Sequence, residues 1–435
     1  MRLGKFARIL LPGLLLVASC TINPVTGKDE LALFAVSSDE EVGIGRKTFP
    51  QAVQQMGGVY PDAELNRYVQ EVGGSLARLS ERPELPWEFR VVNDSSPNAF
   101  ALPGGFIAIT RGLLVNLESE AALAAVLGHE IGHVTARHAV SGMQRGVLFD
   151  LGLTLLSGAT GETGYGPVAQ QAGALAADLL DKSYSREQER ESDRLGIDYM
   201  VKARYSPQGA VQLQEFFSAK LEAGNQNSWL AGMFRTHPFS AERLRQNRLY
   251  LQEKYPGAVS DARYRLEAKG FLAATAKLRG TVAGYQLYDQ ALALEAKGDL
   301  RQAIVTYLQA ATAAPDEALI LTGLGMAYLK SDDIPSARLH LAKAVRLDGS
   351  YYQSRMGLGY ALLQQKEAAR AVAELEASIK LLPTLQGTYL LAEGYELSGR
   401  RDEALQNYRT VAKAAPESKL GRAAAGKLQA LGGRQ

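Results

Sequence analysis

The sequence has little of three things that would place it in other classes of protein. A single cysteine, Cys20, excludes an intrachain disulfide framework. No apolar run reaches the roughly 18 residues that a membrane-spanning helix needs. Neither sign of charge is in excess, with 48 Lys and Arg against 46 Asp and Glu, so the basic surface that a nucleic-acid partner requires is missing. Histidine is scarce too, and four of the five lie between residues 129 and 237.

The first 20 residues follow the order of a bacterial lipoprotein signal. Basic residues precede an apolar run over 9–17, and Val17-Ala18-Ser19-Cys20 resembles a lipobox, in which cleavage is coupled to lipidation of the cysteine. Thr21, rather than Asp, after the cysteine fits sorting to the outer membrane. We therefore predict a signal peptide (1–19), a leader lipidated at Cys20 (20–37) and a periplasmic location at the outer membrane. The alternative is a plain signal peptide with a chance cysteine.

The stretch His129-Glu130-Ile131-Gly132-His133 predicts a zinc site on a helix. Histidines four residues apart project from one helical face and can bind one Zn²⁺, with Glu130 beside the metal as the base that takes a proton from water. The flanking residues are strong helix formers apart from Gly128 and Gly132, which predict a close approach of a neighbouring backbone. Two ligands are too few, so a third must come from elsewhere.

A charged segment over residues 183–196 is the best candidate for the third ligand. Glu189 and Asp193 are four residues apart, so one can bind zinc while the other accepts a hydrogen bond from a ligand histidine. Glu187 and Glu191 have the same spacing, and periodicity alone does not choose between the pairs. Without the zinc motif the segment would be read as a solvated helix face.

The sequence predicts different roles for the other two nearby histidines, His237 and His138. His237 precedes Pro238 in a turn that opens a helix, with Pro238 expected at an early helical position. His237 could be a fourth zinc ligand in a latent state, a donor to the oxyanion of the reaction, or a structural residue. His138 lies five residues after His133, which rotates it off the zinc face of a continuous helix, and we expect a structural role.

Around these motifs, the patterns predict helices over 38–54 and 61–79 and paired strands over 87–92 and 105–110. The strand just before the zinc helix could bind an extended peptide by edge pairing, or could pack structurally on the helix. Apolar blocks and a glycine-rich hinge over 140–180 predict either a lid over the active-site mouth or simple core helices.

The last third of the chain is repetitive. Four alanines recur 34, 34 and 33 residues apart, at Ala303, Ala337, Ala371 and Ala404. This period, with small residues at helix contacts, is typical of tetratricopeptide repeats. We expect four helix pairs over 284–418, a capping helix to Leu431, and a concave surface that binds a protein partner.

These features together predict a mainly α fold of two parts. A zincin-like metallopeptidase domain with helices and a small β-sheet occupies 38–258, and an α-solenoid occupies 284–435. A linker helix over 259–283 joins them.

The motifs resemble those of the bacterial members of the CAAX-prenyl-protease-like zinc metallopeptidases. Nearly the whole mature chain takes part, through residues 23–27, 98–105, 129–133, Ser185-Arg186 with Glu189 and Ser192-Asp193, His237-Pro238, and the repeats. The resemblance implies that Glu189 is the third zinc ligand and that His237 can be a fourth ligand that excludes catalytic water. The chain has Ser192 where the family often has Ala, and it lacks the cysteines that close relatives use for disulfides, which puts redox control of that kind in doubt.

The resemblance also implies a function: a zinc endopeptidase that degrades misassembled outer-membrane proteins, held at the membrane by a lipid anchor. Its substrates would be unfolded or misassembled envelope proteins, and its repeats would engage the outer-membrane assembly machinery. One alternative is a chaperone or assembly scaffold with a largely latent peptidase site. Another is a peptidase for a single membrane-bound substrate.

Overall fold

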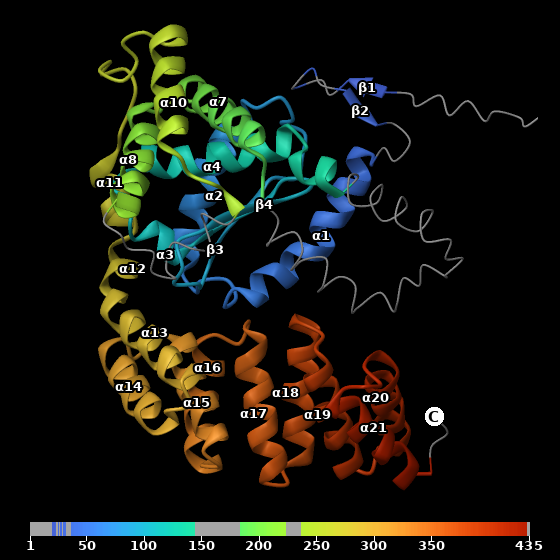
Figure 1. The fold of residues 1–435 in the computed structure, drawn as a ribbon. Helices are drawn as coiled ribbons and strands as arrows, with labels where there is room; N and C mark the ends of the chain where they lie inside the picture. Colours follow the sequence, from blue (N-terminus) through green and yellow to red (C-terminus); the bar gives the residue numbers. More distant parts are fainter. Residues whose placement is uncertain are drawn as a thin grey trace, which may run out of the picture.

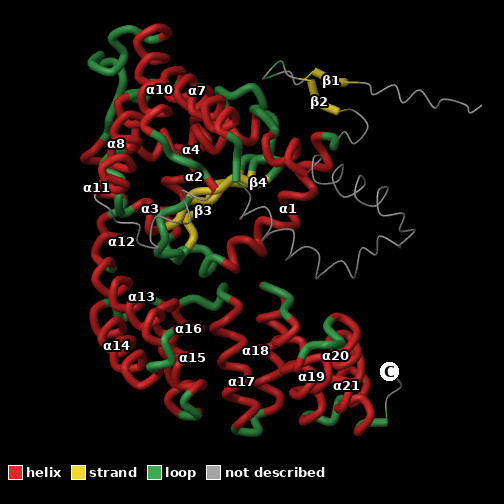
Figure 2. Tube along the Cα trace, in the orientation of Figure 1, coloured by secondary structure: helices red, strands yellow, loops and turns green. Residues whose placement is uncertain are grey.

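The computed structural model of this protein describes residues 36–143, 183–222 and 236–432, together with parts of a short hairpin within 20–31. Figure 1 shows an N-terminal domain, which holds a small sheet among helices, above a solenoid of paired helices, and Figure 2 shows that helices dominate both. The predicted fold class is confirmed. The predicted signal peptide and most of the predicted lid over 140–180 lie outside the described residues.

The helices over 38–54 and 61–79 and the strands over 87–92 and 105–110 begin and end close to where the sequence predicts. Helix α1 is capped by Ser37, which forms a capping box with Glu40, and α2 is capped by Asp62. The bounds are β1 Cys20–Ile22, β2 Asp29–Leu31, α1 Ser38–Gln55, α2 Ala63–Ala77, β3 Glu88–Val92, β4 Ala99–Leu102, β5 Phe106–Thr110, α3 Arg111–Leu114, α4 Glu120–Thr135, α7 Arg186–Lys202, α8 Gln208–Glu222 and α10 Ala241–Lys254. None of the helices in the described ranges is long and apolar enough to cross a membrane.

The three-stranded sheet has the order β3-β5-β4. The predicted pairing of 87–92 with 105–110 is confirmed, and these strands are parallel, with Glu88 opposite Phe106. The expectation of a free edge on the strand just before the zinc helix is wrong, because β5 is central and all its residues are buried. The edge strands are β3 and β4, and β4 lies in a stretch where the sequence patterns predict no strand. A four-residue apolar run is too short for periodicity to identify it as a strand.

Helices α4 and α7 pack with their backbones close together. A Cβ atom on Gly128 would lie 3.1 Å from the carbonyl oxygen of Gly196, and one on Gly132 would lie 3.0 Å from the Cα atom of Ser192. Larger side chains would push the helices apart, so the predicted close approach at both glycines is confirmed. This contact brings the histidines of α4 against the carboxylates of α7.

The solenoid has the predicted four helix pairs followed by a capping helix. The alanines that mark the repeat are fully buried between the helices of each pair. The predicted linker helix is instead two short helices, α11 and α12. The bounds are α11 Ala268–Ala274, α12 Ala276–Gly280, α13 Val282–Ala296, α14 Leu300–Ala313, α15 Ala318–Lys330, α16 Ile334–Leu347, α17 Tyr352–Gln364, α18 Ala368–Leu381, α19 Leu385–Leu397, α20 Arg401–Ala414 and α21 Lys419–Ala430.

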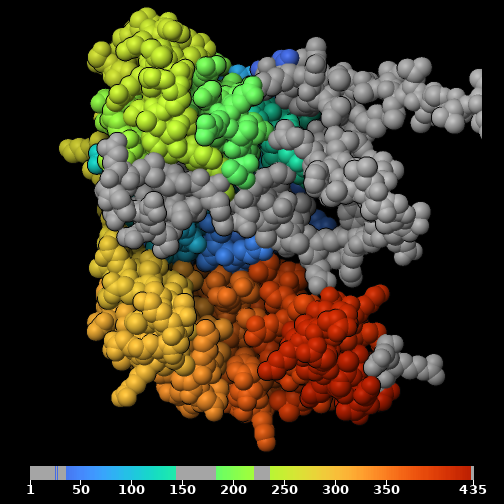
Figure 3. Space-filling model, in the orientation of Figure 1, coloured from blue at the N-terminus to red at the C-terminus, as the bar shows by residue number. Residues whose placement is uncertain are grey.

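The N-terminal domain and the first repeats share one hydrophobic core. Tyr60 is buried in the same cluster as Ile320 and Tyr351 of the solenoid. Polar contacts tie the two parts as well: the Tyr60 hydroxyl donates a hydrogen bond to Glu317 at 3.3 Å, and Gln54 Nε2 donates one to the carbonyl oxygen of Ser350 at 2.7 Å. In Figure 3 the blue surface of the N-terminal domain lies directly against the orange surface of the repeats. The two parts therefore pack against each other through a shared hydrophobic core, in addition to being connected by the chain.

Candidate metal centre

Helix α4 presents His129 and His133 on one face, one turn apart. Ser119 caps the helix by accepting a hydrogen bond from the Ala122 amide, and almost every residue of α4 is buried. The two Nε2 atoms lie 3.0 Å apart. A buried, capped helix holds both imidazoles in a fixed orientation toward a common point.

Two further side chains complete a cluster of donor atoms. Glu189 of α7 places Oε1 3.3 Å from His133 Nε2 and Oε2 3.6 Å from His129 Nε2. His237, in the turn before α10, places Nδ1 3.0 Å from Glu189 Oε1 and 3.4 Å from His129 Nε2. All four donor atoms lie within 4.8 Å of one another, so these four residues could hold a metal ion.

The charge states of His133 and Glu189 suit Zn²⁺. Burial lowers the pKa of His133 well below its usual value, which keeps this imidazole neutral. Burial would raise the pKa of Glu189, but His237, His129 and Arg243 together hold it well below its usual value, so the carboxylate is ionised. Neutral imidazoles with one carboxylate are the donor set of catalytic zinc sites. The residues present therefore fit the metal.

Glu130 lies beside this cluster in the geometry that the sequence predicts. Its Oε1 is 3.6 Å from His237 Nε2, while its Oε2 is buried and has no hydrogen-bond partner. Burial raises the pKa of Glu130, and the nearby His237 and His129 oppose this shift. A buried carboxylate with an open oxygen is suited to accept a proton from a bound water.

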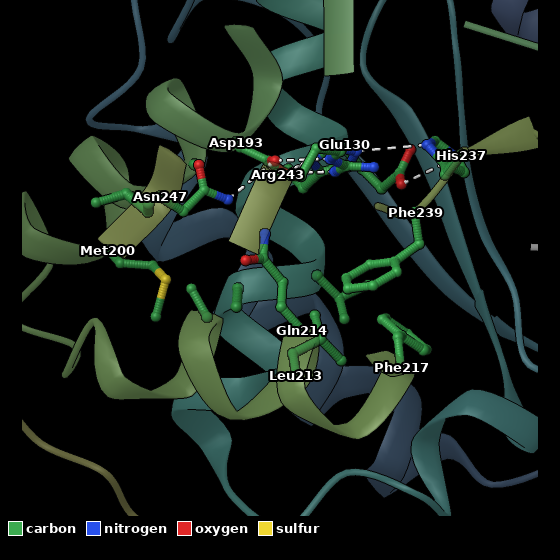
Figure 4. Close-up of a pocket in the computed structure, with 16 residues that line it drawn as sticks. Glu130, Asp193, Met200, Leu213, Gln214, Phe217, His237, Phe239, Arg243 and Asn247 are labelled. Carbon is green, nitrogen blue, oxygen red and sulfur yellow. Dashed lines mark hydrogen bonds and ion pairs between the residues drawn. The ribbon is translucent and has the colours of Figure 1, made fainter. Parts of the chain in front are cut away.

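Asp193 lies one turn after Glu189 and contacts the other nitrogen of a cluster histidine. Its Oδ1 is 2.9 Å from His129 Nδ1, so His129 donates from Nδ1 and directs its Nε2 lone pair toward the cluster. Asp193 also accepts hydrogen bonds from Asn247 and from two nitrogens of Arg243 (Figure 4). Burial would raise the pKa of Asp193, but Arg243 and His129 together hold it below its usual value.

The sequence did not point to Arg243 or Tyr184. The guanidinium of Arg243 lies 2.5 Å from Glu189 Oε2 and 2.7 Å from Asp193 Oδ1, so one cation neutralises both carboxylates of α7. The Tyr184 ring stacks on His133 with 3.8 Å between centroids. Arg243 follows His237 by six residues, and this closeness in sequence is only a weak indication that it belongs to the site. Nothing in the local sequence pattern indicates that Tyr184 does.

His237 lies in a turn, as predicted, but Pro238 is not at a helical position. Helix α10 begins at Ala241 with Ser240 as its cap, so Pro238 lies before the helix. Burial alone would lower the pKa of His237, but the carboxylates of Glu189 and Glu130 raise it to about 9. The two carboxylates that His237 faces thus favour its protonated form.

A pocket with a cavity volume of about 60 Å³ opens next to the cluster. Phe217 and Leu213 of α8 and Phe239 of the turn before α10 form its apolar wall, and Glu130 and His237 lie at its edge (Figure 4). Pockets lined in this way bind apolar groups, with a few polar atoms that fix orientation.

A paired-histidine helix, a glutamate from a second helix and a buried glutamate beside them define the site of a zinc-dependent metallopeptidase. Comparison with known proteins agrees: residues 63–249 match Peptidase family M48, and residues 288–352 and 322–385 match the tetratricopeptide repeat. The chain therefore carries an M48 metallopeptidase domain, which requires zinc, followed by tetratricopeptide repeats, and its enzyme class is metalloendopeptidase.

Three relatives illustrate the range of similarity. The chain is 26% identical to the beta-barrel assembly-enhancing protease of Escherichia coli strain K12, over 93% of this chain and 92% of that protein. It is 35% identical to metalloprotease LoiP of the same strain, over 38% of this chain and 62% of the relative. It is 32% identical to the mitochondrial metalloendopeptidase OMA1 of Schizosaccharomyces pombe, over 43% of this chain and 53% of the relative.

Proposed function

We propose that this chain is a zinc endopeptidase of the bacterial cell envelope that degrades misassembled outer-membrane proteins. The peptidase domain would span 38–258, and the repeats over 284–435 would recruit substrate or the assembly machinery. The observation that carries the proposal is the buried cluster of donor atoms, with Glu130 beside it, inside an M48 domain. The lipobox ending at Cys20 and the name of the E. coli relative support the location and the substrate class.

In the proposed reaction, His129, His133 and Glu189 hold the metal. When bound, Zn²⁺ acts as a Lewis acid that polarises the scissile carbonyl and makes water easier to deprotonate. Glu130 takes a proton from the attacking water and later gives it to the leaving amine. Asp193 keeps His129 in the tautomer that can bind metal.

The apolar pocket would take a bulky apolar side chain next to the scissile bond. Strands of outer-membrane barrels alternate apolar and polar residues, so an unassembled strand offers such side chains at every second position.

We expect Leu213→Trp, which fills the pocket, to lower kcat/KM about tenfold for peptides with Phe or Leu at this position relative to peptides with Ala. Leu292→Trp, at an exposed position of α13, is the control. Equal losses on all peptides would argue against a specificity pocket.

The second candidate function, a scaffold with a latent site, is favoured by the position of His237. Its Nδ1 lies inside the donor cluster, where a fourth ligand would exclude water.

We expect His237→Ala to raise hydrolysis of a short peptide about tenfold, which corresponds to removing a cost of ~1.4 kcal/mol for displacing the histidine. A fall of about 10²–10³-fold would instead assign His237 to stabilisation of the oxyanion. His340→Ala in the solenoid is the control.

A further inference from the structure

Both histidines of α4 use their second ring nitrogen to contact a side chain outside the donor cluster. For His129 the partner is Asp193. For His133 the partner is another histidine: His133 Nδ1 lies 2.9 Å from Nδ1 of His138. The opposite nitrogen of His138, Nε2, lies 3.2 Å from Oε2 of Glu191. His138 is buried, with 4% of its surface exposed.

For a neutral His138, the hydrogen bonds that link His133, His138 and Glu191 can be arranged in one way only. An ionised carboxylate can only accept, so His138 donates from Nε2 to Glu191. A neutral His138 then has an acceptor at Nδ1, and His133 must donate to it from its own Nδ1. This leaves the lone pair of His133 on Nε2, the atom that faces Glu189 at 3.3 Å.

We propose that His138 and Glu191 form a positioning pair that fixes the tautomer and the ring orientation of His133 for metal binding. The inference rests on the proposed function, because it assumes that His133 is a ligand. It gives Glu191 a different role from Glu189: both carboxylates of α7 serve the site, one in the donor cluster and the other through His138. Asp193 supports His129 directly, and Glu191 supports His133 through one intermediate side chain.

A break in the helix makes this contact available. Helix α4 ends at Thr135, and Arg137 has φ of 58°, a left-handed conformation, before a new helical segment begins at His138. In a continuous helix, five residues would rotate His138 by about 140° from His133. The ion pair between Arg137 and the buried Glu41, with Nε and Oε1 2.6 Å apart, stabilises the break.

The test is the zinc affinity of the full chain, measured by competition with a chromophoric chelator. His138→Leu keeps the bulk but removes the acceptor, and we expect affinity to fall about 10–100-fold. His138→Asn keeps an oxygen near the position of Nδ1 and should recover most of this loss. Glu191→Ala, at a partly exposed position, should lower affinity by a smaller factor, and His340→Leu should have no effect. With Co²⁺ in place of zinc, His138→Leu should also change the visible absorption spectrum.

The outcomes separate this inference from the proposed function. If the wild-type chain binds no zinc, or if His133→Ala leaves zinc affinity unchanged, the metal site itself is wrong. If the wild type binds zinc and Glu191→Ala and His138→Leu both bind it equally well, the positioning pair is wrong. Equal losses in His138→Leu and His138→Asn would also overturn it, because an acceptor would then not matter. If His138→Leu does not fold, the zinc affinity of Glu191→Ala alone tests the positioning pair, and an unchanged affinity would overturn it.

Discussion

Replacing Glu130 by Gln is expected to lower kcat about 10²–10⁴-fold while zinc content stays the same. Gln has nearly the same shape but cannot take a proton from water. Glu130 is not among the four residues whose donor atoms form the cluster, so the metal should remain bound. The measurement is hydrolysis of an unfolded envelope protein, with zinc quantified in the same preparation. Glu187→Gln, at an exposed position at the start of α7, is the matched control.

This substitution also separates the two candidate functions. Full-length Glu130→Gln keeps the repeats, the interface and the metal site. Loss of support for outer-membrane assembly in cells that produce it would assign the function to proteolysis. If Glu130→Gln supports outer-membrane assembly as well as the wild type does, the scaffold function would be favoured. Proteolysis that continues at the wild-type rate would contradict the proposed role of Glu130.

Arg243→Met is expected to lower the free energy of unfolding of the metal-free protein by about 3–5 kcal/mol. The guanidinium is almost fully buried and contacts Asp193 and Glu189, and its removal leaves two buried carboxylates without their shared cation. Met keeps the apolar part of the side chain, so lost packing contributes little. Urea unfolding measured by circular dichroism gives the change.

The control for this prediction lies on the same helix. Arg245 is 68% exposed and pairs with Glu242 one turn earlier. Arg245→Met should change stability by no more than about 0.5 kcal/mol. A similar small change for Arg243→Met would show that other groups compensate the two carboxylates.

The sequence predicts those parts of the molecule that depend on local spacing. The histidine pair, its glycines and the repeats are periodic features of single helices, so α4 and the solenoid follow from the pattern. Arg243 could not be predicted as part of the site, because its role comes from packing α10 against α7. The contact of His138 with His133 was missed for a related reason: it requires a left-handed Arg137 that is held by Glu41, some 96 residues earlier.

The choice among the glutamates of α7 shows the same limit. Spacing offers two equivalent pairs, and only the rotation of α7 against α4 distinguishes them. That rotation is set by the contact of Gly128 with Gly196 and of Gly132 with Ser192. It places Glu189 in the donor cluster and Glu191 against His138. A pattern within one helix contains no information about the angle at which a second helix meets it.

The core shared by the N-terminal domain and the first repeats has a consequence for synthesis. The chain emerges N-terminus first, and Tyr60 cannot be covered until Ile320 and Tyr351 have followed it. A partly made chain therefore exposes an unfinished apolar surface until the first repeats have been synthesised. We expect a fragment that ends before the repeats to be less stable and less soluble than the full chain.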